Sequence, residues 1–201
     1  MKTRKGFTLL ELLIVIGILA ILSTTVVLVI NPAQLLKKAR DSQRISDLNT
    51  LKTAIAYYMT EYSDPGIGSA YSVQTYSDLL DVLCYTGGHK ATTTLQTVNG
   101  TGWIPINFTL IPGGSPIGSL PADPNVSDLA ATAVYHYTYQ VSTSTDMTFK
   151  LTARMESDYY SNGGGGDVES TDGGTNLNLY EVGTDMTIPI NTTTACYSVA
   201  Q

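Results

Sequence analysis

The hydrophobic pattern is dominated by one uninterrupted apolar run near the N-terminus. Residues 7–30 contain a single ionisable side chain, the carboxylate of Glu11. At about 1.5 Å per residue, a helix over this run would be about 36 Å long, whereas the hydrocarbon core of a bilayer is about 30 Å thick. The run therefore predicts a membrane-spanning helix that carries one carboxylate close to its N-terminal end.

A second pattern follows the run and predicts that the helix continues to about residue 62. Apolar side chains recur at spacings of three and four while charged side chains fall elsewhere, as in an amphipathic helix. Asn31-Pro32 interrupts this helix, because proline lacks a backbone donor and kinks the chain. The apolar stripe consists of Leu48, Leu51, Ile55, Tyr58, Met59 and Tyr62, and the charged positions are Arg44, Asp47, Lys52 and Glu61.

The remaining residues, 63–201, predict a polar head rich in β-strands. Alternating side chains mark strands over 103–111, 134–141 and 147–155, and the short polar hinge at 142–146 predicts a hairpin between the last two. We expect one face of this antiparallel sheet to cover the helical stripe and the other to face water. The predicted fold class is α+β. Three further elements are a short helix over 76–84, a glycine-rich loop over 161–176 and a final strand over 177–182.

Length and charge narrow the choice of function. The 201 residues are enough for one compact domain plus an N-terminal anchor. Of the 17 acidic residues, 14 lie from Glu61 onward, against only Lys90, Lys150 and Arg154. Phosphate backbones are bound by clusters of Lys and Arg, so we expect no direct binding of nucleic acid.

Basic residues flank the apolar run on both sides, so their distribution does not decide its orientation in a membrane.

The carboxylate in the apolar run needs an explanation. A charge at mid-membrane costs on the order of 2.5 to 3.5 kcal/mol, and less near the interface. From chemistry alone, either Glu11 reaches water by snorkelling or it has a partner. A cleaved secretory signal is an alternative interpretation of the whole run, but the run exceeds the usual apolar region of roughly 7 to 15 residues and no clear A-x-A site follows it.

The stretch KGFTLLELLIVIGILAIL, residues 5–22, resembles the class III signal peptide of type IV pilins and of the pseudopilins of type II secretion. This resemblance implies that residues 1–6 are a leader peptide, that a prepilin peptidase cleaves between Gly6 and Phe7, and that the new amine of Phe7 is methylated. It also implies the type IV pilin fold, in which a long N-terminal helix, residues 7–62, packs against a C-terminal antiparallel sheet. In an assembly, Glu11 would neutralise the Phe7 amine of a neighbouring subunit and so set the register.

The resemblance implies a structural subunit of a type IV pilus. The chain would enter the inner membrane as a single-pass precursor, and an inner-membrane assembly platform would add it to an extracellular helical filament of identical subunits. Adhesion, motility or DNA uptake would be properties of the filament. One alternative is the major pseudopilin of a type II secretion system, which the LPADP loop and the helix pattern also suit. Another is a monomeric membrane-anchored binding protein in which Glu11 only snorkels.

Two further sites are predicted in the head. Cys84 and Cys196 suit an exported domain and predict a disulfide between the early head and the C-terminal tail, with two free buried thiols as the alternative. Calcium prefers six to eight oxygen ligands, and two acidic segments offer such oxygens, although neither has EF-hand spacing. Solvated turns are the alternative, while the resemblance to calcium-binding major pseudopilins favours the metal. The segments contain Asp123, Asn125 and Asp128, and Asp167, Glu169 and Asp172.

Catalytic motifs are not found in the sequence. H-E-x-x-H, G-x-S-x-G and phosphate-loop patterns are all missing, and His89 and His136 each stand alone. We therefore expect the protein not to be an enzyme, and to need no cofactor other than calcium at the segments above.

Overall fold

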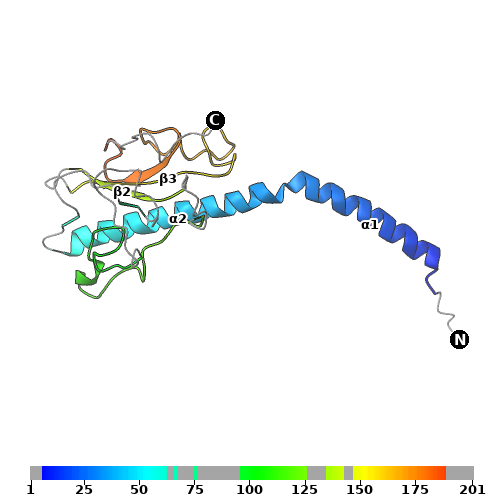
Figure 1. Ribbon diagram of the computed structural model, residues 1–201, viewed down its shortest axis with the longest axis horizontal. Coiled ribbons are helices and arrows are strands. Elements are labelled where there is room, and N and C mark those ends of the chain that lie inside the picture. Colours follow the sequence, from blue (N-terminus) through cyan, green and yellow to red (C-terminus); the bar gives the residue numbers. More distant parts are fainter. Residues whose placement is uncertain are drawn as a thin grey trace.

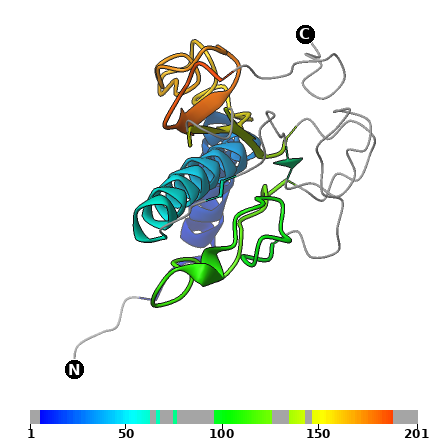
Figure 2. The ribbon, with the colours of Figure 1, turned by 90° about the vertical axis from the view of Figure 1, so that its left-hand side faces the viewer.

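The computed structural model describes residues 6–62, 66–67, 75–76, 96–125, 135–142 and 147–188, apart from the side chains of residues 27–30 and 75–76. Two consecutive helices form a long rod, and the head packs around the second of them (Figure 1). Viewed along the rod, the sheet lies on one side of that helix and the segment 96–125 on the opposite side (Figure 2). The fold class is α+β, as predicted.

The rod consists of α1 (Leu9–Ile30) and α2 (Pro32–Glu61), which are separated by Asn31. Asn31 has left-handed backbone angles, φ 45° and ψ 79°, which asparagine tolerates better than most residues. Pro32 occupies the first position of α2, where its missing N–H is not needed. The predicted interruption is therefore confirmed, and the expected single helix over 7–62 is two helices whose axes diverge at Asn31 (Figure 1).

The head contains a four-stranded antiparallel sheet in the order β1-β2-β3-β4. The strands are β1 (Thr75–Tyr76), β2 (Thr138–Val141), β3 (Phe149–Ala153) and β4 (Tyr180–Gly183). The antiparallel pairing of β2 with β3 confirms the predicted hairpin, with Val141 opposite Phe149 and Thr138 opposite Thr152. Each of these three longer strands is shorter than the range that the sequence predicted.

The core is formed by α2, the sheet and the segment 96–125. Leu48, Leu51 and Ile55 on α2 are fully buried, and Tyr58 is almost so, which confirms the predicted stripe. The two remaining stripe residues, Met59 and Tyr62, are partly buried against the same cluster. Burial of apolar area is the dominant stabilising contribution in such a layer. The sheet contributes Tyr139, Val141, Phe149, Leu151, Ala153, Tyr180 and Val182.

The predicted strand over 103–111 is wrong. This segment contains one isolated bridge, Asn99 to Asn107, and a short 3₁₀ helix, η1 (Phe108–Leu110). Pro105 interrupts the alternating pattern, since it has no N–H for a strand ladder. Apart from Leu110, which is 46% exposed, the large apolar residues of the segment are nevertheless buried. The Trp103 indole donates to the carbonyl oxygen of Pro121 at 2.9 Å.

The expectation that one sheet face meets water is also wrong, because every residue of β2 and β3 is buried. The face turned away from α2 is polar, and two pairs form on it: the hydroxyls of Thr138 and Thr152 lie 2.6 Å apart, and Lys150 Nζ lies 2.8 Å from Glu181 Oε1. The end of the glycine-rich loop packs on this face, where the Thr175 and Asn176 amides donate to Glu181 Oε2.

Some predictions fall outside the described residues. Both cysteines of the predicted disulfide, Cys84 and Cys196, lie there, as does Asp128. The same holds for residues 77–84 of the short helix expected over 76–84, whereas its first residue, Tyr76, is in β1.

Candidate functional site

The first candidate site is the N-terminal helix itself. Its segment Leu9–Val26 is long and apolar enough to cross a membrane. Every residue from 9 to 26 is exposed in the isolated chain, including Leu9 at 82%. Water is an unfavourable surrounding for so much apolar surface, which greatly exceeds what soluble monomers leave uncovered. The surface of α1 therefore fits lipid or other protein chains.

The start of α1 is stabilised by a capping box between Thr8 and Glu11. Glu11 N donates to Thr8 Oγ1 at 3.2 Å, and in return Thr8 N donates to Glu11 Oε2 at 3.0 Å. The Thr8 hydroxyl also donates to Glu11 Oε2 at 2.9 Å. Residues of this type satisfy backbone donors that the first helical turn leaves unpaired. The T-x-x-E spacing in FTLLE is a direct sequence signal for this role, although the sequence alone was interpreted only as a membrane span at this point.

The capping box gives Glu11 a partner within its own chain. Snorkelling and pairing with a neighbour are thus no longer the only explanations for a carboxylate at this position. The described hydrogen bonds use Oε2 alone, and no described residue donates to Oε1. A carboxylate has about four acceptor positions, so Glu11 can cap its own helix and accept from a cation at the same time.

The predicted cleavage position precedes the helix. Gly6 and Phe7 are both exposed and both lie outside α1, and the Phe7 side chain is 77% exposed. A non-helical, exposed peptide bond is accessible to a peptidase without unwinding of the helix.

A second candidate site, which sequence reasoning missed, is a buried ionic cluster between α2 and the head. Arg44 is fully buried, although the pattern predicted a charged position away from the core. Its guanidinium contacts three carboxylates: Asp123 through two hydrogen bonds of 2.7 Å, Asp41 at 2.8 Å, and Glu156. Asp41 also accepts from the backbone amides of residues 156 and 157, at 2.9 and 2.8 Å. The cluster therefore fastens two distant segments of the head to one turn of α2.

Electrostatics within the cluster favour the charged forms. Burial opposes charge on Arg44, but hydrogen bonds and attraction from Asp123 and Glu156 outweigh it and raise the Arg44 pKa. Burial likewise raises the pKa of Glu156, but hydrogen bonds from Arg40 and Arg44 outweigh it and lower that pKa below its ordinary value. Buried ions of this kind are tolerated only when they are paired and hydrogen-bonded.

The first predicted calcium segment takes part in this cluster. Both carboxylate oxygens of Asp123 accept from Arg44, and Oδ1 accepts in addition from the Asn125 amide at 2.8 Å. A guanidinium occupies the position that a cation would take, so the donor set around Asp123 does not fit a calcium ion in this arrangement.

The second predicted calcium segment uses its carboxylates to order the glycine-rich loop. Asp167 accepts from the Gly163 and Ser170 amides, Glu169 accepts from residues 155 and 162, and Asp172 accepts from residues 174 and 181. Hydrogen bonds from Ser170 lower the pKa of Asp167 to about 2, whereas burial raises the pKa of Glu169 and Asp172. Within the described part of the chain, no three His, Cys, Asp or Glu residues gather as a metal centre.

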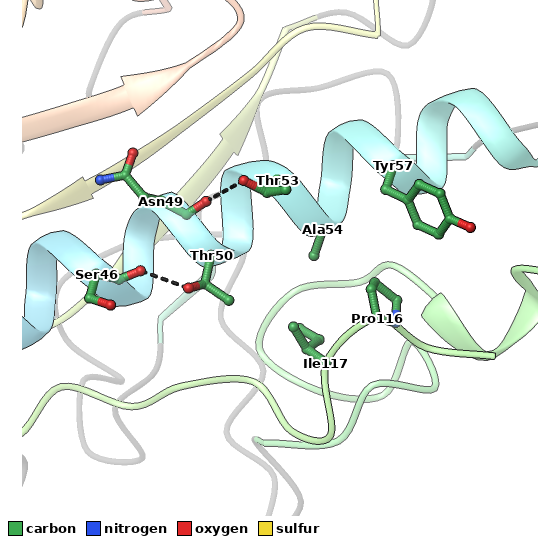
Figure 3. Close-up of a pocket in the computed structure, with 8 residues that line it drawn as sticks. All are labelled: Ser46, Asn49, Thr50, Thr53, Ala54, Tyr57, Pro116 and Ile117. Carbon is green, nitrogen blue, oxygen red and sulfur yellow. Dashed lines mark hydrogen bonds between the residues drawn. The ribbon is translucent and has the colours of Figure 1, made fainter. Parts of the chain in front are cut away.

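A groove runs along the exposed side of α2 beside residues 116–117 (Figure 3). It has a volume of about 510 Å³, and none of its lining residues carries a charge at neutral pH. The Thr50 and Thr53 hydroxyls donate to carbonyl oxygens one turn earlier, each at 2.8 Å, so they are already engaged. This lining offers neither an acid-base pair nor a set of metal ligands. The residues that line the groove are Ser46, Asn49, Thr50, Thr53, Ala54, Tyr57, Pro116 and Ile117.

Comparison with known proteins identifies the N-terminal segment. Residues 1–27 match the family model described as the prokaryotic N-terminal methylation motif. No curated protein and no solved structure matches the chain. The protein therefore carries the class III signal peptide that is typical of type IV pilins and pseudopilins, and its long apolar N-terminal helix and antiparallel sheet are consistent with the pilin fold.

Proposed function

We propose that the protein is a structural subunit of a type IV pilus and assembles through α1 into a helical extracellular filament. One observation carries the proposal: the methylation motif covers most of a helix that is apolar on all sides and is exposed from residue 9 to 26, with none of the described residues covering it. Such a helix is stable first in a membrane and then among other copies of itself, where packing replaces lipid. The head then forms the filament surface.

In this proposal the two carboxylate oxygens of Glu11 have different partners. Its Oε2 caps α1 through Thr8, while Oε1 accepts from the methylated Phe7 amine of a neighbouring subunit. An axial offset between subunits would leave both charges unpaired in apolar surroundings, which is costly. The pairing therefore selects one register.

The test is electron microscopy of material sheared from producing cells, with mass spectrometry of the mature N-terminus. Wild type should give long fibres that begin at methylated Phe7. Glu11→Gln should give none, because glutamine keeps the cap but loses the charge. Thr8→Ala is the matched control, since it loses about 1 kcal/mol of capping but keeps the charge, and fibres should persist.

The outcomes separate the hypotheses. Normal fibres from Glu11→Gln would show that charge pairing does not set the register. Correct processing without fibres in wild type would favour the major pseudopilin of type II secretion, a candidate that the LPADP loop and the helix pattern support. An uncleaved N-terminus at Met1 would overturn both assignments.

A further inference from the structure

The glycine-rich loop lies at the end of the head nearest to α1 (Figure 1). Asp158, just before this loop, bonds to the first turn of α2: Gln34 Nε2 donates to Asp158 Oδ2 at 2.9 Å. One turn later, Lys38 Nζ lies 4.0 Å from the centre of the Tyr159 ring. The next tyrosine, Tyr160, has its hydroxyl 3.2 Å from Ser42 Oγ. This part of the head is therefore held directly against the start of α2.

The start of α2 lies close to the membrane that α1 would span. Gln34 is four residues past the end of α1, or about 6 Å along the helix, and the headgroup layer adds about 5 to 7 Å beyond the hydrocarbon core. Figure 1 shows α2 inclined to α1. The height of an α2 residue above the membrane therefore increases more slowly than its distance along the helix. Helical side chains also lean toward the N-terminus, which here means toward the membrane.

Exposed side chains at this level have the composition of a membrane interface. Leu35 and Leu36 are 58% and 62% exposed, and Tyr159 is 40% exposed. Amphipathic aromatic rings and snorkelling lysines are enriched at the boundary between lipid and water. These residues lie directly beyond an apolar span, so they continue its surface rather than start a separate patch.

The distribution of ion pairs leaves two cations available on this surface. Arg40 and Arg44 are committed to the buried cluster, whereas no described residue forms an ion pair with Lys37 or Lys38. Neither lysine is neutralised by a described carboxylate, and Lys38 lies over the Tyr159 ring, so both charges are available to lipid phosphates. Asp158 is the carboxylate beside them, and it is hydrogen-bonded to Gln34.

We infer that, in the membrane-anchored precursor, this base of the head docks on the phospholipid headgroup layer through Leu35, Leu36, Lys37, Lys38 and Tyr159. The inference rests on the proposed function, because it needs α1 inserted in a bilayer. Docking holds the head at a defined height and tilt before a subunit leaves the membrane, and the contact is given up on assembly.

The test places a tryptophan at the base and another at a matched distant position in the full-length chain. Tyr159→Trp and Tyr57→Trp suit this purpose, since the two tyrosines are 40% and 42% exposed. Tyr57 is 19 residues after Lys38 on α2, about 28 Å farther along the helix. The native Trp103 is fully buried, so its fluorescence is the same background signal in every variant. The chains are reconstituted in phosphatidylcholine–phosphatidylglycerol vesicles that contain a phosphatidylcholine brominated high on its acyl chains.

Docking predicts that Tyr159→Trp loses most of its added fluorescence to the brominated lipid, whereas Tyr57→Trp loses none. Adding Leu35→Ser and Leu36→Ser to the Tyr159→Trp chain should restore the fluorescence, because these substitutions remove the apolar contact from an exposed surface. Equal quenching at the two positions, in chains that co-sediment with vesicles, would overturn the docking while leaving the filament proposal intact. Failure to co-sediment would overturn the membrane anchor and the docking together.

Discussion

The helices α1 and α2 are consecutive parts of one rod, yet their side chains have opposite surroundings. From residue 9 to 26, α1 is exposed throughout, whereas one face of α2 is fully buried in the head. α1 is apolar on all sides and therefore presents no preferred face, whereas α2 has one apolar stripe. The comparison shows that hydrophobicity alone does not make a helix part of a core. The stripe of α2 is covered within the chain, whereas the apolar surface of α1 is exposed in the isolated chain.

Two carboxylates show the same contrast at the level of single residues. Glu11 on α1 accepts from Thr8, three residues away. Asp41 on α2 accepts from Glu156 and Ser157, which are 115 and 116 residues away, and also contacts Arg44. The first arrangement needs only a local motif, and the second needs the folded head.

The largest expected effect comes from breaking the contact of α2 with the head. Arg44→Met leaves Asp41, Asp123 and Glu156 without their shared counter-ion, and removal of one partner from a buried ion pair costs about 3 to 5 kcal/mol. We expect the free energy of unfolding, measured with denaturant on the full chain in detergent, to fall by about this amount.

Two controls locate this effect. Arg40→Met removes an ion pair whose arginine side chain is 32% exposed, so the loss should stay below about 1 kcal/mol. Ile14→Ala on the exposed α1 should change unfolding of the head by less than about 0.5 kcal/mol. An Arg44→Met chain as stable as wild type would mean that the cluster does not hold the head on α2.

A smaller effect is expected where two strands approach closely. A Cβ atom on Gly183 would overlap the carbonyl oxygen of Phe149 on the neighbouring strand. We expect Gly183→Ala to lower the free energy of unfolding by about 1 to 3 kcal/mol, as overpacking does. Gly118→Ala is the control, since no atom lies within 4 Å of its added Cβ, and unchanged stability in both chains would contradict the packing of β3 against β4.

The smallest effect concerns the pH dependence of the glycine-rich loop. Hydrogen bonds from Ser170 and Gly163 lower the pKa of Asp167 from 3.8 to about 2. A carboxyl group whose pKa is lower in the folded state contributes stability above its unfolded pKa and loses it as the pH falls through the folded value. Asp167→Asn should therefore show a shallower loss of stability than wild type between pH 3.8 and about 2 in thermal unfolding. Parallel curves for the two chains would contradict this role.

The sequence by itself determined the features that depend on near neighbours. The apolar span, the T-x-x-E cap, the interruption at Asn31-Pro32 and the stripe from Leu48 to Tyr58 all follow from spacings of a few residues. The hairpin of β2 and β3 belongs to the same class, because alternating side chains on either side of a short hinge specify it.

Only the tertiary structure decided which groups meet across long separations. The periodicity of apolar residues predicts which positions of a helix are buried and which are exposed. It does not predict that a charged residue such as Arg44 is buried, because that burial depends on carboxylates from distant parts of the chain that pair with it. Asp123, predicted as a calcium ligand, is 79 residues from the arginine that it binds. The polar face of the sheet is buried for the same reason: its partners, including the amides of Thr175 and Asn176, come from a loop that no local pattern directs there.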